Sequence, residues 1–148
     1  MKQLILFFFL VTFSVPAFAQ FPLGSEMSKI KSYFADNIPY ASVQEFKTEN
    51  GTNAICFTKV KVVGDYTFYF DNYGKCSSYV VTYDRNELPD LTRRFDARFC
   101  RGYITKWVAE DNSFDITLIP SKPGENFFSI VYRPLITGTF TTNSLVSN

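Results

Sequence analysis

Short runs of alternating polar and apolar residues, separated by turn residues, constrain the fold of this chain more than any other feature. Residues 42–48 alternate and lead into Asn50-Gly51, a dipeptide typical of tight hairpin turns. Residues 66–71 read Tyr-Thr-Phe-Tyr-Phe-Asp, which places three aromatic rings on one face of a strand. Four such runs follow one another at a spacing of about ten residues, at 42–48, 53–63, 66–71 and 76–84. This succession predicts an antiparallel meander.

Two other segments have the spacing of amphipathic helices. The first runs from Ser25, a candidate N-cap, to about residue 36, with apolar residues at positions 27, 30 and 34. The second begins near Asn86, also a candidate cap, and ends near Arg101-Gly102, with apolar residues at 88, 91, 95 and 99. Helices this short are marginal on their own, so we expect both to pack on a sheet.

The order of these elements predicts an α+β domain over residues 20–140, with two short helices packed on antiparallel β-meanders. After the second helix we expect strands at 103–109, 113–119 and 126–133, with 135–140 as a candidate eighth. Two arrangements stay open. One is a tandem helix-plus-meander repeat with halves 24–84 and 86–140. The other is a single long sheet with both helices on one face. Residues 141–148 are predicted to form a flexible tail.

The first nineteen residues have the pattern of a signal peptide. Lys2 is followed by an apolar run from Leu4 to Val15, and Pro16-Ala17-Phe18-Ala19 provides a cleavage site with small residues. The run is shorter than the roughly 20 residues that a membrane span requires, so we expect cleavage of residues 1–19 rather than anchoring. The sequence therefore predicts a secreted or periplasmic protein without stable membrane insertion after cleavage.

Histidine is absent from all 148 residues. Its absence excludes a Ser-His-Asp triad, a Cys-His dyad and a metal site with His ligands. The sequence also lacks a glycine-rich phosphate loop and a nucleophile elbow. The net charge of +1 argues against a nucleic-acid partner. We therefore expect a non-catalytic protein with no metal and no cofactor.

Three cysteines occur, at Cys56, Cys76 and Cys100. An oxidising compartment favours one disulfide among them, with the third thiol left over or bonded to another chain. The spacing does not decide which two would pair, and a buried free thiol is the alternative.

Arginines gather on and just after the second predicted helix. Arg94 and Arg98 lie one helical turn apart, and Arg101 falls near the same face. These three are candidates for a partner-binding face, since Arg is frequent at binding hot spots. The alternative is a solvated face whose charge is partly compensated by local pairs with the acidic residues at 90 and 96.

Aromatic residues make up 18% of the chain and occur on both faces of the predicted strands. Tyr69 lies opposite the face of Phe68 and Phe70, and Trp107 is the only tryptophan. Core packing accounts for most of these rings. Tyr69 and Trp107 are candidates for an exposed recognition surface, where Tyr and Trp are favoured.

A family resemblance rests on three segments. They are Gly24-Ser25 with Met27, Ile30 and Phe34; the aromatic strand 66–71 followed by Cys76; and Tyr103-Ile104-Thr105-Lys106-Trp107 after the second helix. In element order the chain resembles the helix-plus-meander modules of secreted bacterial proteins such as the PepSY-like group and the beta-lactamase inhibitor proteins. The resemblance implies a binding or inhibitory role.

These observations predict a binding module that recognises a protein or a cell-envelope component through an aromatic-rich surface. One alternative is a carrier for a small apolar ligand or lipid, with its pocket between helices and sheet. Another is a glycan hydrolase that uses a pair of carboxylates.

Overall fold

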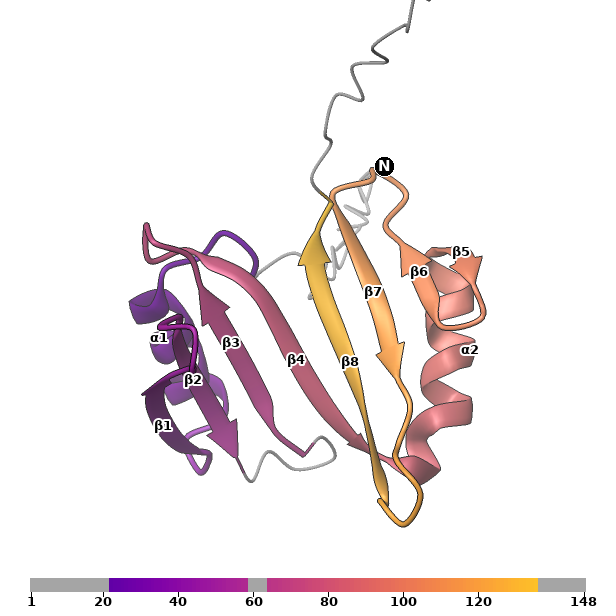
Figure 1. Ribbon diagram of the computed structural model, residues 1–148, viewed down its shortest axis with the longest axis horizontal. Coiled ribbons are helices and arrows are strands. Elements are labelled where there is room, and N and C mark those ends of the chain that lie inside the picture. The colour runs from indigo at the N-terminus through magenta and orange to yellow at the C-terminus, as the bar shows by residue number, and fades with distance from the viewer. Residues whose placement is uncertain (1–21, 59–63, 136–148) are drawn as a thin grey trace, which may run out of the picture.

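The computed structural model describes residues 22–58 and 64–135. In this part, two short helices and one 3-10 turn accompany eight strands in one antiparallel sheet (Figure 1). The helices are α1 (Met27–Asn37) and α2 (Leu88–Arg98), and η1 (Arg85–Glu87) is the 3-10 turn. The strands are β1 (Ser42–Lys47), β2 (Asn53–Thr58), β3 (Tyr66–Phe70), β4 (Cys76–Asp84), β5 (Cys100–Tyr103), β6 (Lys106–Val108), β7 (Phe114–Ile119) and β8 (Phe127–Pro134). The predicted α+β class is confirmed.

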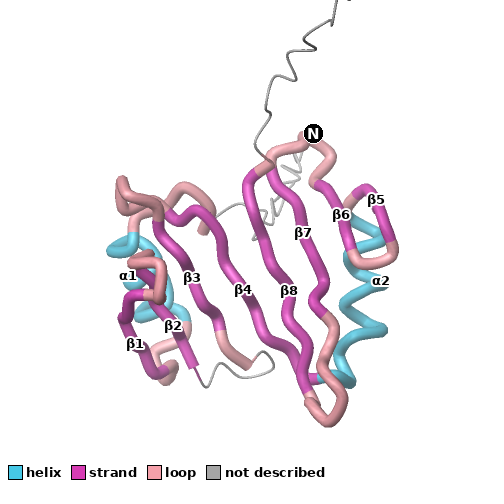
Figure 2. The backbone as a smooth tube through the Cα atoms, in the orientation of Figure 1, coloured by secondary structure: helices cyan, strands magenta, loops and turns pink. Residues whose placement is uncertain are grey.

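The strand order is β1-β2-β3-β4-β8-β7-β6-β5. Each half of the sheet is therefore a four-strand meander that follows its own helix, and the halves meet where β4 pairs with β8. Both helices lie on the same face of the sheet, one toward each end (Figure 2). The sequence left open a tandem helix-plus-meander repeat and a single long sheet with both helices on one face. The structure combines the two, because the repeated element order builds one continuous sheet.

The strand register aligns one row of residues across the whole sheet. From β1 to β5 the row is Glu45, Ile55, Phe68, Tyr79, Tyr132, Ile116, Trp107 and Arg101. Its six central members are buried, and its two end members lie on the edge strands. Because side chains alternate along a strand, this row and its second neighbours form the helix-covered face.

The two helices bury their apolar stripes on this face. On α1, Phe34 stacks on Phe57 of β2 with ring centroids 3.9 Å apart. On α2, Phe95 meets Trp107 of β6 edge to face at 5.2 Å. The aromatic alternation of the sequence thus supplies the surface onto which both short helices dock, and such pairs add to the energy of burial alone.

The helix ends differ from the sequence prediction. The prediction that Ser25 caps the first helix is wrong: Glu26 is the N-cap, and no side chain caps there. Asn86 is not a cap either, because it lies within η1, where its backbone N–H donates to Asp84. The second helix ends at Arg98 rather than near Arg101, since Phe99 already has extended backbone angles.

The first predicted hairpin is confirmed. Gly51, between β1 and β2, has a φ of 79°, a left-handed conformation that glycine adopts without strain. Its N–H donates to the carbonyl of Thr48 at 2.9 Å. This turn fixes the register in which Lys47 lies opposite Asn53.

The prediction of a single strand over residues 103–109 is wrong. The segment after the second helix forms the β5–β6 hairpin instead, with Ile104 and Thr105 in the turn. The hairpin is irregular, because the register shifts between Arg101 and Tyr103. An additional edge strand, β5, results from this turn.

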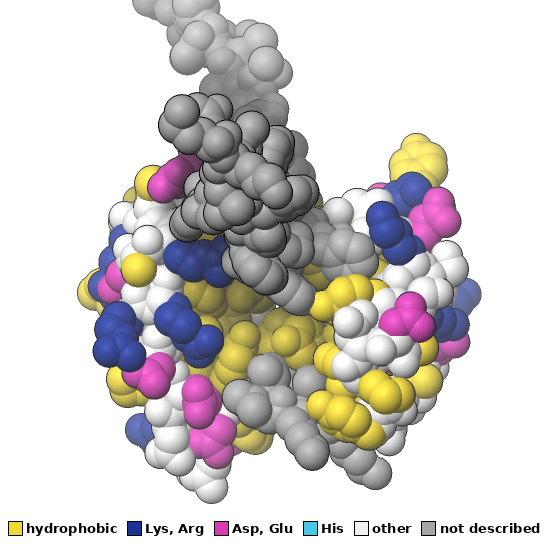
Figure 3. Space-filling view, turned by 180° about the vertical axis from the view of Figure 1, so that it is seen from behind, with side chains coloured by type: hydrophobic (Ala, Val, Ile, Leu, Met, Phe, Trp, Pro, Cys, Tyr) yellow, Lys and Arg dark blue, Asp and Glu magenta, His cyan; other side chains and the backbone are white. Residues whose placement is uncertain are grey.

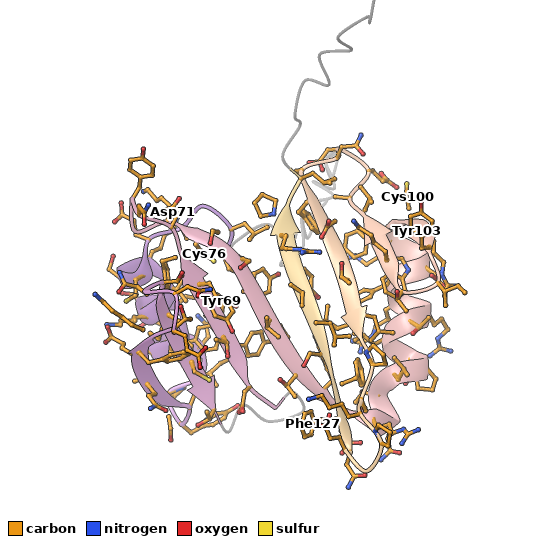
Figure 4. The ribbon with its side chains drawn as sticks, in the orientation of Figure 1. Tyr69, Asp71, Cys76, Cys100, Tyr103 and Phe127 are labelled. Atoms are coloured by element: carbon orange, nitrogen blue, oxygen red, sulfur yellow. The ribbon has the colours of Figure 1, made fainter. Side chains whose placement is uncertain are left out.

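The predicted disulfide is also wrong, since Cys56, Cys76 and Cys100 are all free thiols. Cys56 lies on β2 and Cys76 on β4, with β3 between them. Two strand spacings amount to about 9–10 Å, beyond the roughly 7 Å limit for a disulfide between α-carbons. Cys100 lies on the far half of the sheet from Cys76 (Figure 4). Burial raises the pKa of the Cys76 thiol to about 12, which keeps it protonated.

Several predictions fall outside the described residues. They concern the signal peptide at 1–19, the end of the strand predicted at 53–63, nearly all of the candidate strand at 135–140, and the tail at 141–148. Between residues 22 and 135, leaving out 59–63, no helix has the length and apolar character needed to cross a membrane.

Candidate functional site

A groove lies between the two helices on the helix-covered face. It has a volume of about 340 Å³, within the range of small-molecule sites. Side chains of β3, β4 and β8 form its floor, and α1 and α2 form its walls. Viewed from the helix side, hydrophobic side chains line the hollow between the helices, and Lys and Arg side chains gather beside it toward α2 (Figure 3). The helices cover the ends of the sheet and leave this central strip between them.

The floor is built from stacked aromatic rings. Tyr79 stacks on Tyr132 with ring centroids 4.4 Å apart and planes 4° from parallel. Phe68 stacks on the other side of Tyr79 at 5.5 Å. These three rings belong to neighbours in the central row, on β3, β4 and β8. Cross-strand pairing therefore produces a continuous aromatic platform, the kind of surface against which an apolar ligand packs.

Phenol hydroxyls add a polar element to this floor. Burial raises the pKa of Tyr66, Tyr79, Tyr83 and Tyr132 above the usual value, and their mutual proximity raises the pKa of Tyr66, Tyr79 and Tyr132 further. The Tyr83 and Tyr132 hydroxyls share a hydrogen bond. The hydroxyls stay neutral near pH 7, so they can orient a ligand by hydrogen bonding without contributing charge.

Two of the predicted binding arginines line the groove. Arg94 and Arg98 on α2 are the charged residues of its described lining, which contains no carboxylate. The Arg94 guanidinium lies near enough to the Tyr83 hydroxyl to oppose the burial-induced rise of that pKa. The Arg98 guanidinium lies 5.8 Å from the centre of the Phe99 ring. The arginine face predicted from the sequence thus includes one wall of the groove.

The alternative prediction of self-compensated charge applies to other arginines. Asp90 pairs with Arg93 at 2.8 Å rather than with Arg94. Asp96 pairs with Arg101 at 3.0 Å. Within residues 22–58 and 64–135, Arg94 and Arg98 form no ion pair. Local pairing therefore leaves the two groove arginines available.

Trp107 and Arg101 are held in a structural cluster, so the prediction that Trp107 belongs to an exposed recognition surface is wrong. Trp107 is 1% exposed, and its indole N–H donates to Asp96 at 2.7 Å. The Arg101 guanidinium donates hydrogen bonds to the other oxygen of Asp96 and to the carbonyl of Ile104. It also lies over the Trp107 ring, 5.6 Å from the ring centre. This cluster fastens α2 to the β5–β6 hairpin.

Tyr69 is not brought together with the arginines. It is half-buried on β3, in register with Ser78 and Ala54. Its neighbour Phe68 faces the helices, so Tyr69 faces the opposite side of the sheet. Figure 4 shows it in the half of the molecule that carries α1, far from the labelled Tyr103 of β5.

The carrier alternative places a pocket between helices and sheet, but the sequence prediction did not name the residues of the groove floor. The alternation places Tyr79, Val81 and Tyr83 on one face of β4, and that part is confirmed. The missing information was the distance between the helices. A pattern within one strand does not reveal whether a helix covers that strand. Aromatic residues between two helices therefore have the same sequence pattern as residues of the core.

Two acidic residues outside the groove, Asp115 and Asp111, make structural contacts. Asp115 is buried on β7, between Lys106 at 3.0 Å and Arg133 at 3.5 Å, and so joins three adjacent strands. The Asp111 side chain accepts from the N–H of Ser113, as turn residues commonly do. Across the described ranges, no group of three or more Cys, Asp or Glu side chains is arranged to hold a metal ion.

Comparison of the chain with protein-family models, curated proteins and solved structures gave no match.

Proposed function

We propose that this protein is a non-catalytic binding module that holds a small apolar ligand in the groove between α1 and α2. One observation carries the proposal: a hollow of about 340 Å³ whose floor is a stacked aromatic platform and whose walls come from two helices that do not close over it. Mostly apolar concave sites with a few convergent polar groups are the usual form of ligand pockets.

The fold supports this function. The floor belongs to the centre of an eight-stranded sheet, where it is held by neighbours on both sides. Ordered rings lose little freedom when a ligand arrives, so a rigid platform lowers the cost of binding. The repeated helix-plus-meander order is in keeping with the resemblance to secreted bacterial binding modules. With the predicted signal peptide, it supports a secreted or periplasmic carrier of an apolar envelope component.

The test uses the predicted mature chain, residues 20–148, and the neutral dye N-phenylnaphthylamine, whose fluorescence rises in apolar surroundings. We expect saturable dye binding to the wild-type protein. Ile38→Asp places a charge in the groove wall and should weaken dye binding at least tenfold. Ile119→Asp is the matched control, because Ile119 is 49% exposed on the opposite face.

Two results would contradict the proposal. One is the absence of dye binding to a folded wild-type protein, with folding checked by Trp107 fluorescence. The other is equal loss of binding in Ile38→Asp and Ile119→Asp, which would place the dye outside the groove.

A second candidate function, recognition of a protein partner, is favoured by the tip of the β5–β6 hairpin. Tyr103 and Ile104 are 78% and 84% exposed there and are adjacent, so they place two large apolar side chains together in solvent. If this tip binds a partner, the double variant Tyr103→Ser/Ile104→Ser should no longer retain proteins that the wild-type chain captures from an envelope extract. Retention by the double variant of every protein that the wild type captures would exclude the tip.

A further inference from the structure

The charge around the groove is one-sided. Arg94 and Arg98 lie on the same wall, one turn apart on α2, and the described lining has no acidic residue to balance them. Both guanidiniums lack an ion-pair partner within the described residues, whereas Arg93 and Arg101 on either side of them each have one. Two neighbouring cations beside an apolar floor complement a ligand that carries negative charge at one end.

We propose, on the basis of the function proposed above, that the ligand is an amphiphile with a short apolar chain and one anionic head group, bound by Arg94 and Arg98. The planar guanidinium presents parallel N–H groups that match the oxygens of a carboxylate or a phosphate. Either head group satisfies this chemistry, and the chain would lie over the aromatic platform.

Tyr83 on β4 adds a hydroxyl at the same place. This hydroxyl shares a hydrogen bond with the Tyr132 hydroxyl, and a phenol can both donate and accept. The Arg94 guanidinium approaches this hydroxyl from α2. Donors from the floor and from one wall therefore converge at the α2 side of the groove, and this convergence sets the orientation of the ligand. The head lies at α2 and the chain runs toward α1.

The groove volume limits the length of the chain. One water molecule occupies about 30 Å³ of liquid, so 340 Å³ holds roughly eleven groups of that size. An eight-carbon chain with a small head group is of this size. Octanoate, octyl phosphate, octanol and octyltrimethylammonium have unbranched chains of eight carbons, the carboxyl carbon of octanoate included, and carry different head groups, so they separate head recognition from burial of the chain.

The experiment measures displacement of N-phenylnaphthylamine from the wild-type chain 20–148 by each of these four compounds. We expect octanoate, octyl phosphate or both to displace the dye at concentrations at least about tenfold below octanol, because hydrogen bonds to charged groups are the stronger ones. Octyltrimethylammonium should be the weakest competitor. The two anionic compounds distinguish a carboxylate from a phosphate head.

Matched variants locate the effect. Arg94→Gln/Arg98→Gln should weaken the anionic competitors to the level of octanol and leave octanol unchanged. Arg85→Gln/Arg93→Gln removes the same charge from positions on η1 and α2 that do not line the groove and should change no competitor more than about twofold. Tyr83→Phe should weaken the anionic competitors several-fold while octanol binds as before.

The outcomes separate this proposal from the one it rests on. Dye binding with equal displacement by octanol and by both anionic compounds would overturn the anionic head group and leave the apolar groove standing. If both double variants weakened the anionic competitors equally, the anionic head group would also be overturned, since net charge rather than the groove arginines would then be responsible. Absence of dye binding would overturn the groove function itself.

Discussion

Replacement of Asp96 tests how α2 is fastened to the sheet. Asp96 accepts the N–H of the buried Trp107 at 2.7 Å and pairs with Arg101 at 3.0 Å. In Asp96→Ala the indole N–H stays buried without an acceptor, which costs about 1–3 kcal/mol. Loss of the partly exposed pair with Arg101 adds about 0–1 kcal/mol. Alanine recovers roughly 0.5 kcal/mol through its helix propensity. We expect a net loss of about 2 kcal/mol in the free energy of unfolding.

Asp96→Asn is the informative comparison. The amide oxygen can still accept the indole N–H, so only the ion pair with Arg101 is lost, and we expect a loss of about 1 kcal/mol or less. Urea unfolding followed by fluorescence measures both variants, because Trp107 is the only tryptophan of the chain and leaves a buried site on unfolding. Equal destabilisation by alanine and asparagine would refute the reasoning, since the hydrogen bond to the indole would then contribute nothing.

Three further predictions concern the core, the tyrosines and the thiols. Phe34→Ala should lower the free energy of unfolding by about 3–5 kcal/mol, because Phe34 is buried against Phe57, whereas the exposed Ala35→Ser should stay within about 0.5 kcal/mol in the same urea titration. Burial raises the pKa of the groove tyrosines, so the stability that they contribute is complete below pH 10 and is lost as pH rises toward their folded-state pKa, at about 1.4 kcal/mol per pH unit for each. Alkaline unfolding should therefore coincide with tyrosinate absorbance, and titration of all tyrosines near pH 10 in a folded protein would contradict this. Denatured, non-reduced protein should react at three thiols, and native protein should react slowly at Cys76, whose thiol is buried; a count below three would restore the disulfide.

Patterns that act within one element predicted much of this fold. The 3.6-residue spacing placed Ile30 and Phe34 on the buried face of α1, and both are buried. The alternation placed Phe68 and Phe70 on the same side of β3, and both are buried too. Asn50-Gly51 predicted the first hairpin correctly because a tight turn depends on local backbone conformation, here the left-handed φ of Gly51.

The failed predictions involve relations between distant segments. The preference of Tyr and Trp for recognition surfaces makes Trp107 a candidate for an exposed surface, but α2 covers it with Phe95 and Asp96, which the sequence does not show to lie beside it. The disulfide depended on which strands are adjacent, and β3 separates Cys56 from Cys76. The candidate site was predicted in part: Arg94 and Arg98 were named, but their tyrosine neighbours come from β4 and β8, which only the sheet brings to α2.

The central position of β8 has a consequence for folding. β8 follows all the other described strands in the sequence, yet it pairs on one side with β4, joining Tyr79 to Tyr132, and on the other with β7. Before β8 is added, a growing chain would expose two unpaired strand edges at what becomes the middle of the sheet, one in each half. Because the pairing of β4 with β8 joins residues far apart in sequence, we expect this closure to be slow and the unclosed chain to be the species exposed to aggregation. Once β8 is inserted, it seals both edges in one step and completes the aromatic platform with Tyr132, so the groove and the folded sheet form together.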